Sequence, residues 1–277
     1  EMPGYGLLAS PTLYTGQVVT VLLCADRHNG KSVTCQLFIR IYGAQNSLET
    51  VWGTSCTLAA QQEQRCLWQI PDTAGEPIAE VGIAFSAEQE SSGYIYLDRL
   101  TWEGTPDVTF TRPPADGDMW HRAWINGLDQ FRVSKGEGLR QVQNYGRGLI
   151  IQGTREWMDY SISAAVKPHI VKACGIAARV QGMRRYYALL ITSGQRAQLV
   201  KELDGEQILE EAPITWELDR AYDLSLRVVG NRIQAFVDQQ MVFDVRDENS
   251  PLESGAIGLI CQEGRVDCDA VSVRPAN

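Results

Sequence analysis

Apolar and polar residues alternate with a period of two over much of the chain, which is the pattern of half-buried β-strands. At 36–42 (QLFIRIY) the odd-numbered residues are Leu or Ile, so one face of that strand would enter a core. No stretch of the first hundred residues repeats apolar residues at the helical spacing. In this region the alternation predicts strands at 18–24, 36–42, 66–70, 79–85 and 93–102.

The second half of the chain continues the pattern with tighter turns. Asp204-Gly205 and Gly230-Asn231 supply the positive φ angles that two-residue hairpin turns need. Short strands joined in this way form an antiparallel meander, which would close as a two-sheet sandwich. The expected fold class is all-β, with two antiparallel β-sandwich (jelly-roll) domains. The strands predicted here are 148–153, 159–167, 175–181, 184–192, 196–203, 206–212, 222–229, 232–238, 240–246, 255–263 and 267–275.

One segment, EGTPDVTFTRPPADGD at 103–118, has the composition of a connection rather than of a strand. It contains three prolines, two glycines and three aspartates in addition to its glutamate. Such residues favour turns and linkers. A domain boundary is therefore predicted near residue 108, giving a first domain at 1–108 and a second at 109–277.

Composition excludes several classes of partner. The net charge is −9, from 34 acidic against 25 basic residues, and Lys and Arg do not cluster. Nucleic acid and anionic membranes are therefore not expected partners. No apolar run approaches the roughly 18 residues of a membrane-spanning helix. Residue 1 is Glu rather than Met, which predicts a processed protein or a piece of a larger one; secreted and cytoplasmic locations both stay open.

The seven cysteines include two pairs that could form disulfides. Cys24 and Cys35 flank one turn-like segment, and Cys56 and Cys66 flank another, so either pair could lie across a β-hairpin. Cysteine is also a common buried residue, and the bonded state of all four stays open. There is no CxxC motif, and the three histidines lack the spacing of metal ligands, so a zinc site is not expected.

Acidic residues suggest two further sites, each with a simpler interpretation. Glu202, Asp204 and Glu206 have the spacing that puts three carboxylates on one face of a strand, as in some glycosidases. A hairpin turn at Asp204-Gly205 would instead place the two glutamates on different strands, and we favour that interpretation. Asp98, like Asp267 and Asp269, precedes or lies in a closing strand, where a structural calcium or a solvated, turn-capping carboxylate are the alternatives. No other cofactor and no catalytic residue is expected.

Arginine and aromatic residues of the second half predict a sugar site. Saccharides bind by stacking on aromatic rings and by hydrogen bonds to planar donors such as Arg. In GIAARVQ (175–181) alternation would send Arg179 away from the core. The alternative is that the rings are core residues and the arginines are solvated. The predicted carbohydrate-binding residues are Trp157, Arg179, Arg185, Tyr187 and Glu263.

From about residue 120 onward the chain resembles the concanavalin A-like/laminin-G sandwich superfamily. The segments that carry this resemblance are GIAARVQGMRRYYALLI, LVKELDGEQIL, LSLRVVGNRIQAFVDQQMVFDV and SGAIGLICQEGRVDCDAVSVRP. Members of this superfamily include carbohydrate-binding modules and 3-keto-disaccharide hydrolase domains. The first hundred residues resemble a galactose-binding-like jelly roll, through PIAEVGIAFSAEQESSGYIYLDRLTWEG.

The two halves in this order are also similar to the C-terminal region of some microbial ADP-ribosylglycohydrolases. That resemblance implies an upstream helical catalytic domain that this chain lacks. The main hypothesis is a non-catalytic carbohydrate-binding region of a larger glycan- or ADP-ribose-processing protein, with sugar on the concave sheet of the second sandwich. The alternatives are a glycoside hydrolase of concanavalin-like fold, using Glu202 or Glu263, and a structural or dimerisation appendage.

Overall fold

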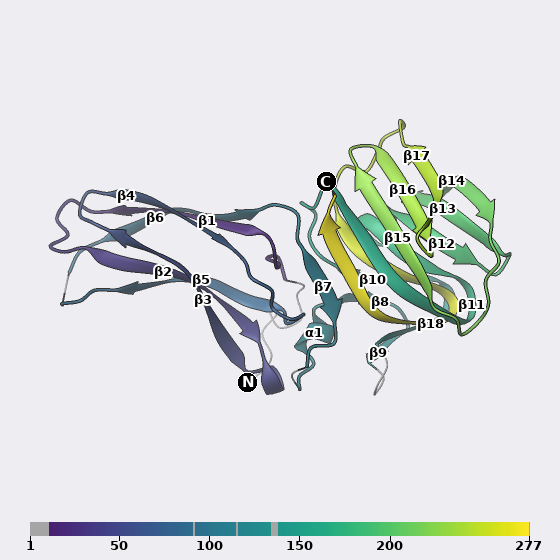
Figure 1. Cartoon of the computed structure of the whole chain (residues 1–277), viewed down its shortest axis with the longest axis horizontal. Helices are drawn as coiled ribbons and strands as arrows, with labels where there is room; N and C mark the ends of the chain where they lie inside the picture. Colours follow the sequence, from purple (N-terminus) through teal and green to yellow (C-terminus); the bar gives the residue numbers. More distant parts are fainter. Residues whose placement is uncertain (1–10, 91, 115, 134–137, 277) are drawn as a thin grey trace. The chain divides into compact units, whose positions relative to one another are not determined.

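The computed structural model describes residues 11–90, 92–114, 116–133 and 138–276. Its strands are antiparallel, and the all-β, two-sandwich prediction is confirmed (Figure 1). The strands are β1 (Val18–Ala25), β2 (Val33–Tyr42), β3 (Leu48–Leu58), β4 (Glu63–Gln69), β5 (Ile78–Ser86), β6 (Ile95–Glu103), β7 (Val108–Thr111), β8 (Ile125–Gly127), β9 (Gln130–Val133), β10 (Leu139–Gln152), β11 (Tyr160–Gly182), β12 (Arg185–Thr192), β13 (Arg196–Leu203), β14 (Glu206–Pro213), β15 (Tyr222–Val229), β16 (Arg232–Val237), β17 (Gln240–Arg246) and β18 (Ala256–Pro275). The helical pieces are the 3-10 turn η2 (Ala44–Asn46) and α1 (Met119–Arg122).

Contacts divide the chain into two units. The smaller unit comprises Leu13–Gly104 and Pro114–Met119, and the larger comprises Thr105–Pro113 and Trp120–Asn277. The connecting segment around residue 108 is itself structured, because β7 pairs with β18 in the larger unit. No helix in the described ranges is long and apolar enough to cross a membrane.

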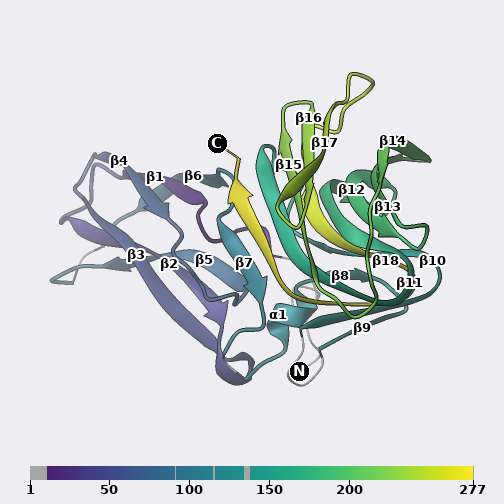
Figure 2. The ribbon, with the colours of Figure 1, turned by 45° about the vertical axis from the view of Figure 1, so that its right-hand side comes forward.

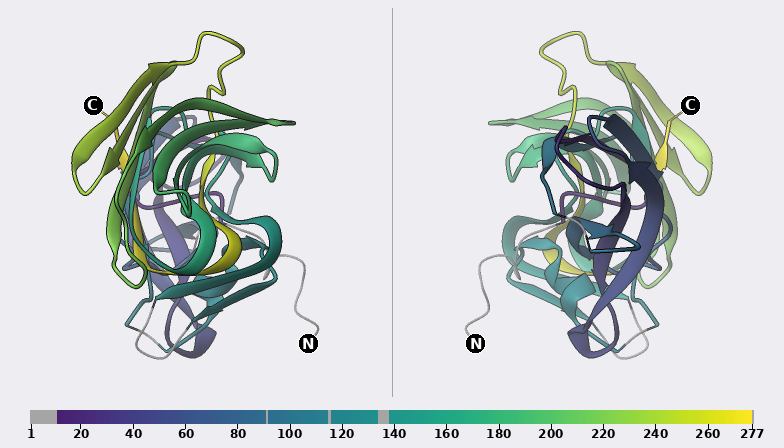
Figure 3. Two further views of the ribbon diagram at one scale, coloured as in Figure 1. Left: turned by 90° about the vertical axis from the view of Figure 1, so that its right-hand side faces the viewer. Right: turned by 90° about the vertical axis from the view of Figure 1, so that its left-hand side faces the viewer.

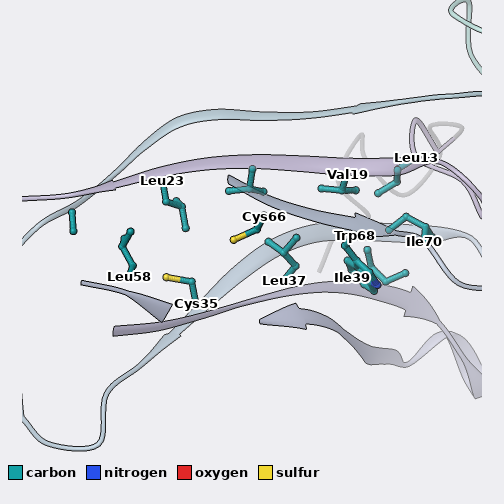
Figure 4. Close-up of a cluster of buried hydrophobic side chains, with 12 residues drawn as sticks. Leu13, Val19, Leu23, Cys35, Leu37, Ile39, Leu58, Cys66, Trp68 and Ile70 are labelled. Carbon is teal, nitrogen blue, oxygen red and sulfur yellow. The ribbon is translucent and has the colours of Figure 1, made fainter. Parts of the chain in front are cut away.

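The smaller unit is a sandwich of two three-stranded sheets, β4-β1-β6 and β3-β2-β5. Alternating residues of β1 and β2 fill the space between the sheets, among them Val19, Leu37 and Ile39, each at most 1% exposed (Figure 4). Cys56 and Cys66 form a disulfide. The bond does not cross a hairpin within one sheet, the geometry that the sequence left open, because Cys56 lies on β3 and Cys66 on β4, so it joins the two sheets.

Two long strands, β11 and β18, give the larger unit its architecture. The first half of β11 pairs with β15 and with the end of β18, whereas its second half pairs with β12 and with the start of β18. Both strands therefore pass from one sheet of the sandwich into the other (Figure 2). We call β7, β18, β11, β15, β16 and β17 the front sheet, and β14, β13, β12, β11, β18 and β10, with β8 and β9, the curved sheet.

The curved sheet bends so strongly that its two sides meet. Arg147 on β10 and Glu206 on β14 are separated by four intervening strands, which would place them about 24 Å apart in a flat sheet. Their side chains instead form an ion pair with an N–O distance of 2.5 Å. The bend is visible in Figure 3. Leu149 shares with Arg147 the face of β10 that turns to the inside of the bend, and it belongs to a second buried apolar cluster with Tyr186 and Val200. The concave surface is therefore largely a packed core.

Candidate functional site

The outward face of the front sheet carries a row of small hydroxyl side chains. In residues 160–168 of β11 and in β15 the even-numbered residues point into the sandwich and are buried, so the odd-numbered residues face outward. Ser272, Ser163 and Ser225 lie directly opposite one another on β18, β11 and β15. Phe236 on β16 lies opposite Ser225 and ends the row. Small side chains in the middle and a larger ring at one side make the face hollow.

This hollow is a groove of about 610 Å³. Two carboxylates, an amide and the half-buried Phe236 ring surround its floor of Ser and Ala residues. The lining residues are Ser163, Ala164, Ala165, Asp223, Leu224, Ser225, Phe236, Gln239, Asp269, Ala270 and Ser272.

Polar groups of the groove are available to a ligand. Asp223 and Asp269 are both exposed, and within the described chain neither forms an ion pair. Asp269 accepts one hydrogen bond, from the backbone N–H of Gly138. Gln239 has a φ of 66° in the turn between β16 and β17, which places this amide in the groove wall. Carboxylates accept hydrogen bonds from hydroxyls, and serines both donate and accept them, so the groove suits a polyhydroxylated, uncharged ligand.

The structure corrects the expected orientation of Arg179. Its exposed fraction is 1%, because a β-bulge between Ala177 and Val180 interrupts the alternation and gives Arg179 a φ of 52°. The guanidinium donates to the backbone oxygens of Met158, Gly230 and Leu252. It also pairs with Asp159 at 3.1 Å. Arg179 therefore fastens three loops to the end of the sandwich and has no surface to offer a sugar.

Tyr187 and Trp157 are buried as well, with exposed fractions of 0% and 1%. The Tyr187 hydroxyl donates to Asp247 at 2.6 Å and accepts the N–H of Leu252, while Lys201 pairs with the same carboxylate at 2.6 Å. Burial alone would raise the pKa of Asp247, but hydrogen bonds from Lys201 and Tyr187 outweigh it and hold the pKa below its usual value. We call Arg179, Tyr187, Lys201 and Asp247 the loop clasp.

Two of the predicted sugar-binding residues remain at the surface. Arg185 is half-exposed and pairs with Asp204 in the turn after β13, and Glu263 pairs with Lys172 at 3.5 Å. Neither residue lines the groove on the front sheet. Their contact with a ligand stays a prediction.

The three acidic residues proposed for one face of a strand have different roles in the structure: Asp204 forms a turn, and Glu202 and Glu206 form ion pairs. Asp204 has a φ of 55° in the turn, and Glu202 lies opposite Glu206 on the neighbouring strand, so the hairpin interpretation is confirmed. Glu202 pairs with Arg184 and Glu206 with Arg147. Asp98 is exposed on β6. The described residues contain no cluster of three or more metal-ligating side chains, and a structural calcium at Asp98 stays a prediction.

The groove residues could not be recognised from a motif in the sequence, because Ser and Ala are common residues that belong to no specific binding pattern here. One signal was present: DYSISAAVK places Ser161, Ser163 and Ala165 at successive outward positions, and YDLSLRVV places Ser225 outward on the neighbouring strand. Outward positions of an exposed sheet more often carry long charged side chains. A run of outward Ser and Ala on adjacent strands therefore indicates a depression.

Comparison with known proteins identifies the fold. No protein-family model matches the chain, and no curated protein matches it in sequence. Among solved structures, a carbohydrate-binding module, CBM66, from Bacillus subtilis is similar with a TM-score of 0.50 and 16% identity, over 55% of this chain and 94% of that chain. This similarity establishes a shared β-sandwich fold.

Two other solved structures are similar at lower scores. A Bacillus subtilis protein of unknown function with a galectin-like fold has a TM-score of 0.44 and 12% identity, over 55% of this chain and 89% of that chain. The galectin LEC-6 of Caenorhabditis elegans has a TM-score of 0.35 and 12% identity, over 55% of this chain and 95% of that chain.

Proposed function

We propose that the larger unit is a carbohydrate-binding module whose ligand lies in the groove of the front sheet. The observation that carries this proposal is the groove itself: a floor of Ser and Ala, one half-buried aromatic ring and two carboxylates that have no cationic partner in the described part of the chain. A sugar ring has an apolar face of C–H groups and a rim of hydroxyls. The first would lie against Phe236, and the second would donate to Asp223 and Asp269. The shared fold with CBM66 supports the same conclusion.

The charge of the groove narrows the ligand class. No Lys or Arg lines it, whereas two carboxylates do. A uronic acid or sulfated sugar would bring a negative charge beside these carboxylates and would be repelled. The ligand is therefore a neutral saccharide. We also propose a larger host protein with an upstream catalytic domain that acts on glycans or ADP-ribose. ADP-ribose itself carries an anionic diphosphate, so the groove should repel it, and it belongs in the ligand panel beside polygalacturonate.

Calorimetry on the full chain tests the proposal with a panel of neutral oligosaccharides, polygalacturonate and ADP-ribose. Asp223→Asn removes one acceptor for a sugar hydroxyl, so the affinity for the neutral ligand should fall about tenfold, the value of one charge-assisted hydrogen bond. Asp244→Asn is the matched control, because Asp244 is exposed on the same face of the front sheet but outside the groove. Absence of binding by every saccharide, or equal effects of the two variants, would overturn the proposal.

A further inference from the structure

The smaller unit has a pocket of its own at one end of its sandwich. The end of β5, the start of β2 and the start of β6 meet there, so both sheets contribute to the pocket. Its volume is about 250 Å³. The lining residues are Asn29, Val33, Phe85, Ser86, Ala87, Ser92, Gly93 and Ile95.

Phe85 forms an aromatic wall that the core leaves open. It lies directly opposite Cys35, a core residue that is 1% exposed, so its ring points to the inside of the sandwich. Nevertheless 49% of Phe85 is exposed, because the sandwich ends at this point. Ile95, opposite the buried Ala25, also faces inward and packs against the core. The floor of the pocket is therefore apolar and continuous with the core.

Polar groups stand beside this apolar floor. Within the described chain the hydroxyls of Ser86 and Ser92 form no hydrogen bond to another residue, and no ionisable side chain lines the pocket. One aromatic face with free hydroxyls, and no charge, is the combination that a neutral sugar ring requires. The pocket volume of about 250 Å³ is sufficient for one such ring.

The pocket wall is held rigidly. The Asn29 side chain is buried and both accepts the N–H of Tyr94 and donates to its carbonyl, each at 2.8 Å. Gly93 has a φ of 152°, and a Cβ at this position would lie 2.0 Å from the Asn29 amide oxygen. The two residues therefore lock together, which sets the shape of the pocket before a ligand enters.

We infer that the smaller unit binds a single neutral monosaccharide residue in this pocket, independently of the groove in the larger unit. Phe85 would stack on the sugar ring, and Ser86 and Ser92 would bind its hydroxyls. The chain would then have two saccharide sites of different size, one in each unit.

Backbone amide shifts of the full chain, titrated with methyl glycosides of glucose, galactose, mannose and fructose, test the inference. At least one glycoside should shift the amides of Asn29, Ser86, Ser92 and Ile95 in a saturable manner, with a dissociation constant of about 1 mM for a ligand of this size. Phe85→Ala should weaken this binding at least fivefold. Leu67→Ala is the matched control, because Leu67 is also 49% exposed in the same unit but lies outside the pocket.

Ser86→Ala combined with Ser92→Ala gives a second test if Phe85→Ala fails to fold, and it should also weaken binding. Saturable binding that both variants leave unchanged, or no pocket shift with any glycoside, would overturn the inference. Equal affinity for cyclohexanol would do the same, because the hydroxyls would then contribute nothing. Amide shifts at Ser163 and Asp223 report binding in the groove, so the pocket proposal and the groove proposal are tested independently.

Discussion

The larger unit has two sets of polar side chains, one buried in its interior and one on the outward face of the front sheet. The loop clasp gathers Arg179, Tyr187, Lys201 and Asp247 in the interior, where each finds several partners within the chain. The groove of the front sheet offers smaller groups, and its carboxylates have no cationic partner among the described residues. The buried charged residues of the loop clasp therefore stabilise the fold, while the serines and exposed carboxylates of the groove leave a surface free for a ligand.

The difference is instructive because a buried charge must be paired. Removing a guanidinium or an ammonium group from water costs far more than one hydrogen bond returns, so such groups stay buried only within complete networks. A complete network has no capacity for a ligand. A binding surface needs the reverse, namely groups that water satisfies before the ligand does.

The largest expected effect comes from breaking the clasp at its carboxylate. Asp247→Ala leaves the Lys201 ammonium, 3% exposed, without its counter-ion, and the free energy of unfolding of the larger unit should fall by about 3–5 kcal/mol. Chemical denaturation followed by tryptophan fluorescence measures this loss. A change of less than about 1 kcal/mol, the value of a surface pair, would mean that the pair is solvated and the clasp is not a buried network.

Removing the guanidinium of Arg179 should lower the free energy of unfolding by somewhat less than removing the Asp247 carboxylate. Arg179→Met keeps the length of the side chain but deprives the carbonyls of Met158, Gly230 and Leu252 of a donor, which should lower the free energy of unfolding by about 2–4 kcal/mol. Saccharide affinity of the folded variant should stay at the wild-type value. If the variant folds with wild-type stability but no longer binds saccharide, Arg179 belongs to the ligand site after all.

In the smaller unit, the Glu76 carboxyl group forms no ion pair with another of the described residues. Burial and the nearby charge of Glu49 raise the pKa of Glu76 to about 7. Folding therefore favours the protonated form, so this contribution to stability is complete below the usual pKa of 4.5 and is lost as the pH rises through about 7. The smaller unit should be less stable at pH 8 than at pH 5 by about 1–2 kcal/mol, after allowing for solvent screening of a partly exposed group. Thermal melts of wild type and Glu76→Gln measure it; an unchanged pH dependence in the variant would contradict the assignment.

The smallest effect is expected where the charges are exposed. Asp244→Asn removes an ion pair with Arg232 on the outward face of the front sheet, and this should not shift the denaturation midpoint measurably. A shift as large as that of Asp247→Ala would remove the distinction between interior and surface pairs.

Most of the fold followed from alternation, and the exceptions have physical causes. β3 escaped prediction because nearly all its residues, including Trp52, are exposed or half-buried at the edge of a sheet, so no alternation marks it. The predicted strands 159–167 and 175–181 are one strand, since bulges at Pro168 and Ala177 bend β11 from sheet to sheet without ending it.

The site was harder to predict than the fold. Alternation assigns each side chain to a face, but it fails after a bulge, and that is why Arg179 was expected outside. Alternation also does not show whether both faces of a strand are covered by other parts of the fold. Both faces of β12 are covered, and Tyr187 is therefore buried. A strand that is buried on both faces is a property of the assembled sandwich and not of its own sequence.

The most direct test compares one aromatic ring of the groove with one aromatic ring of the loop clasp. Phe236→Ala and Tyr187→Phe are made in the full chain, and the affinity of each for the best saccharide of the panel is measured by calorimetry. The account predicts that Phe236→Ala weakens binding about tenfold, as the loss of one stacking partner should, while Tyr187→Phe binds like wild type. Weaker binding by Tyr187→Phe together with unchanged binding by Phe236→Ala would contradict the assignment of the groove as the ligand site.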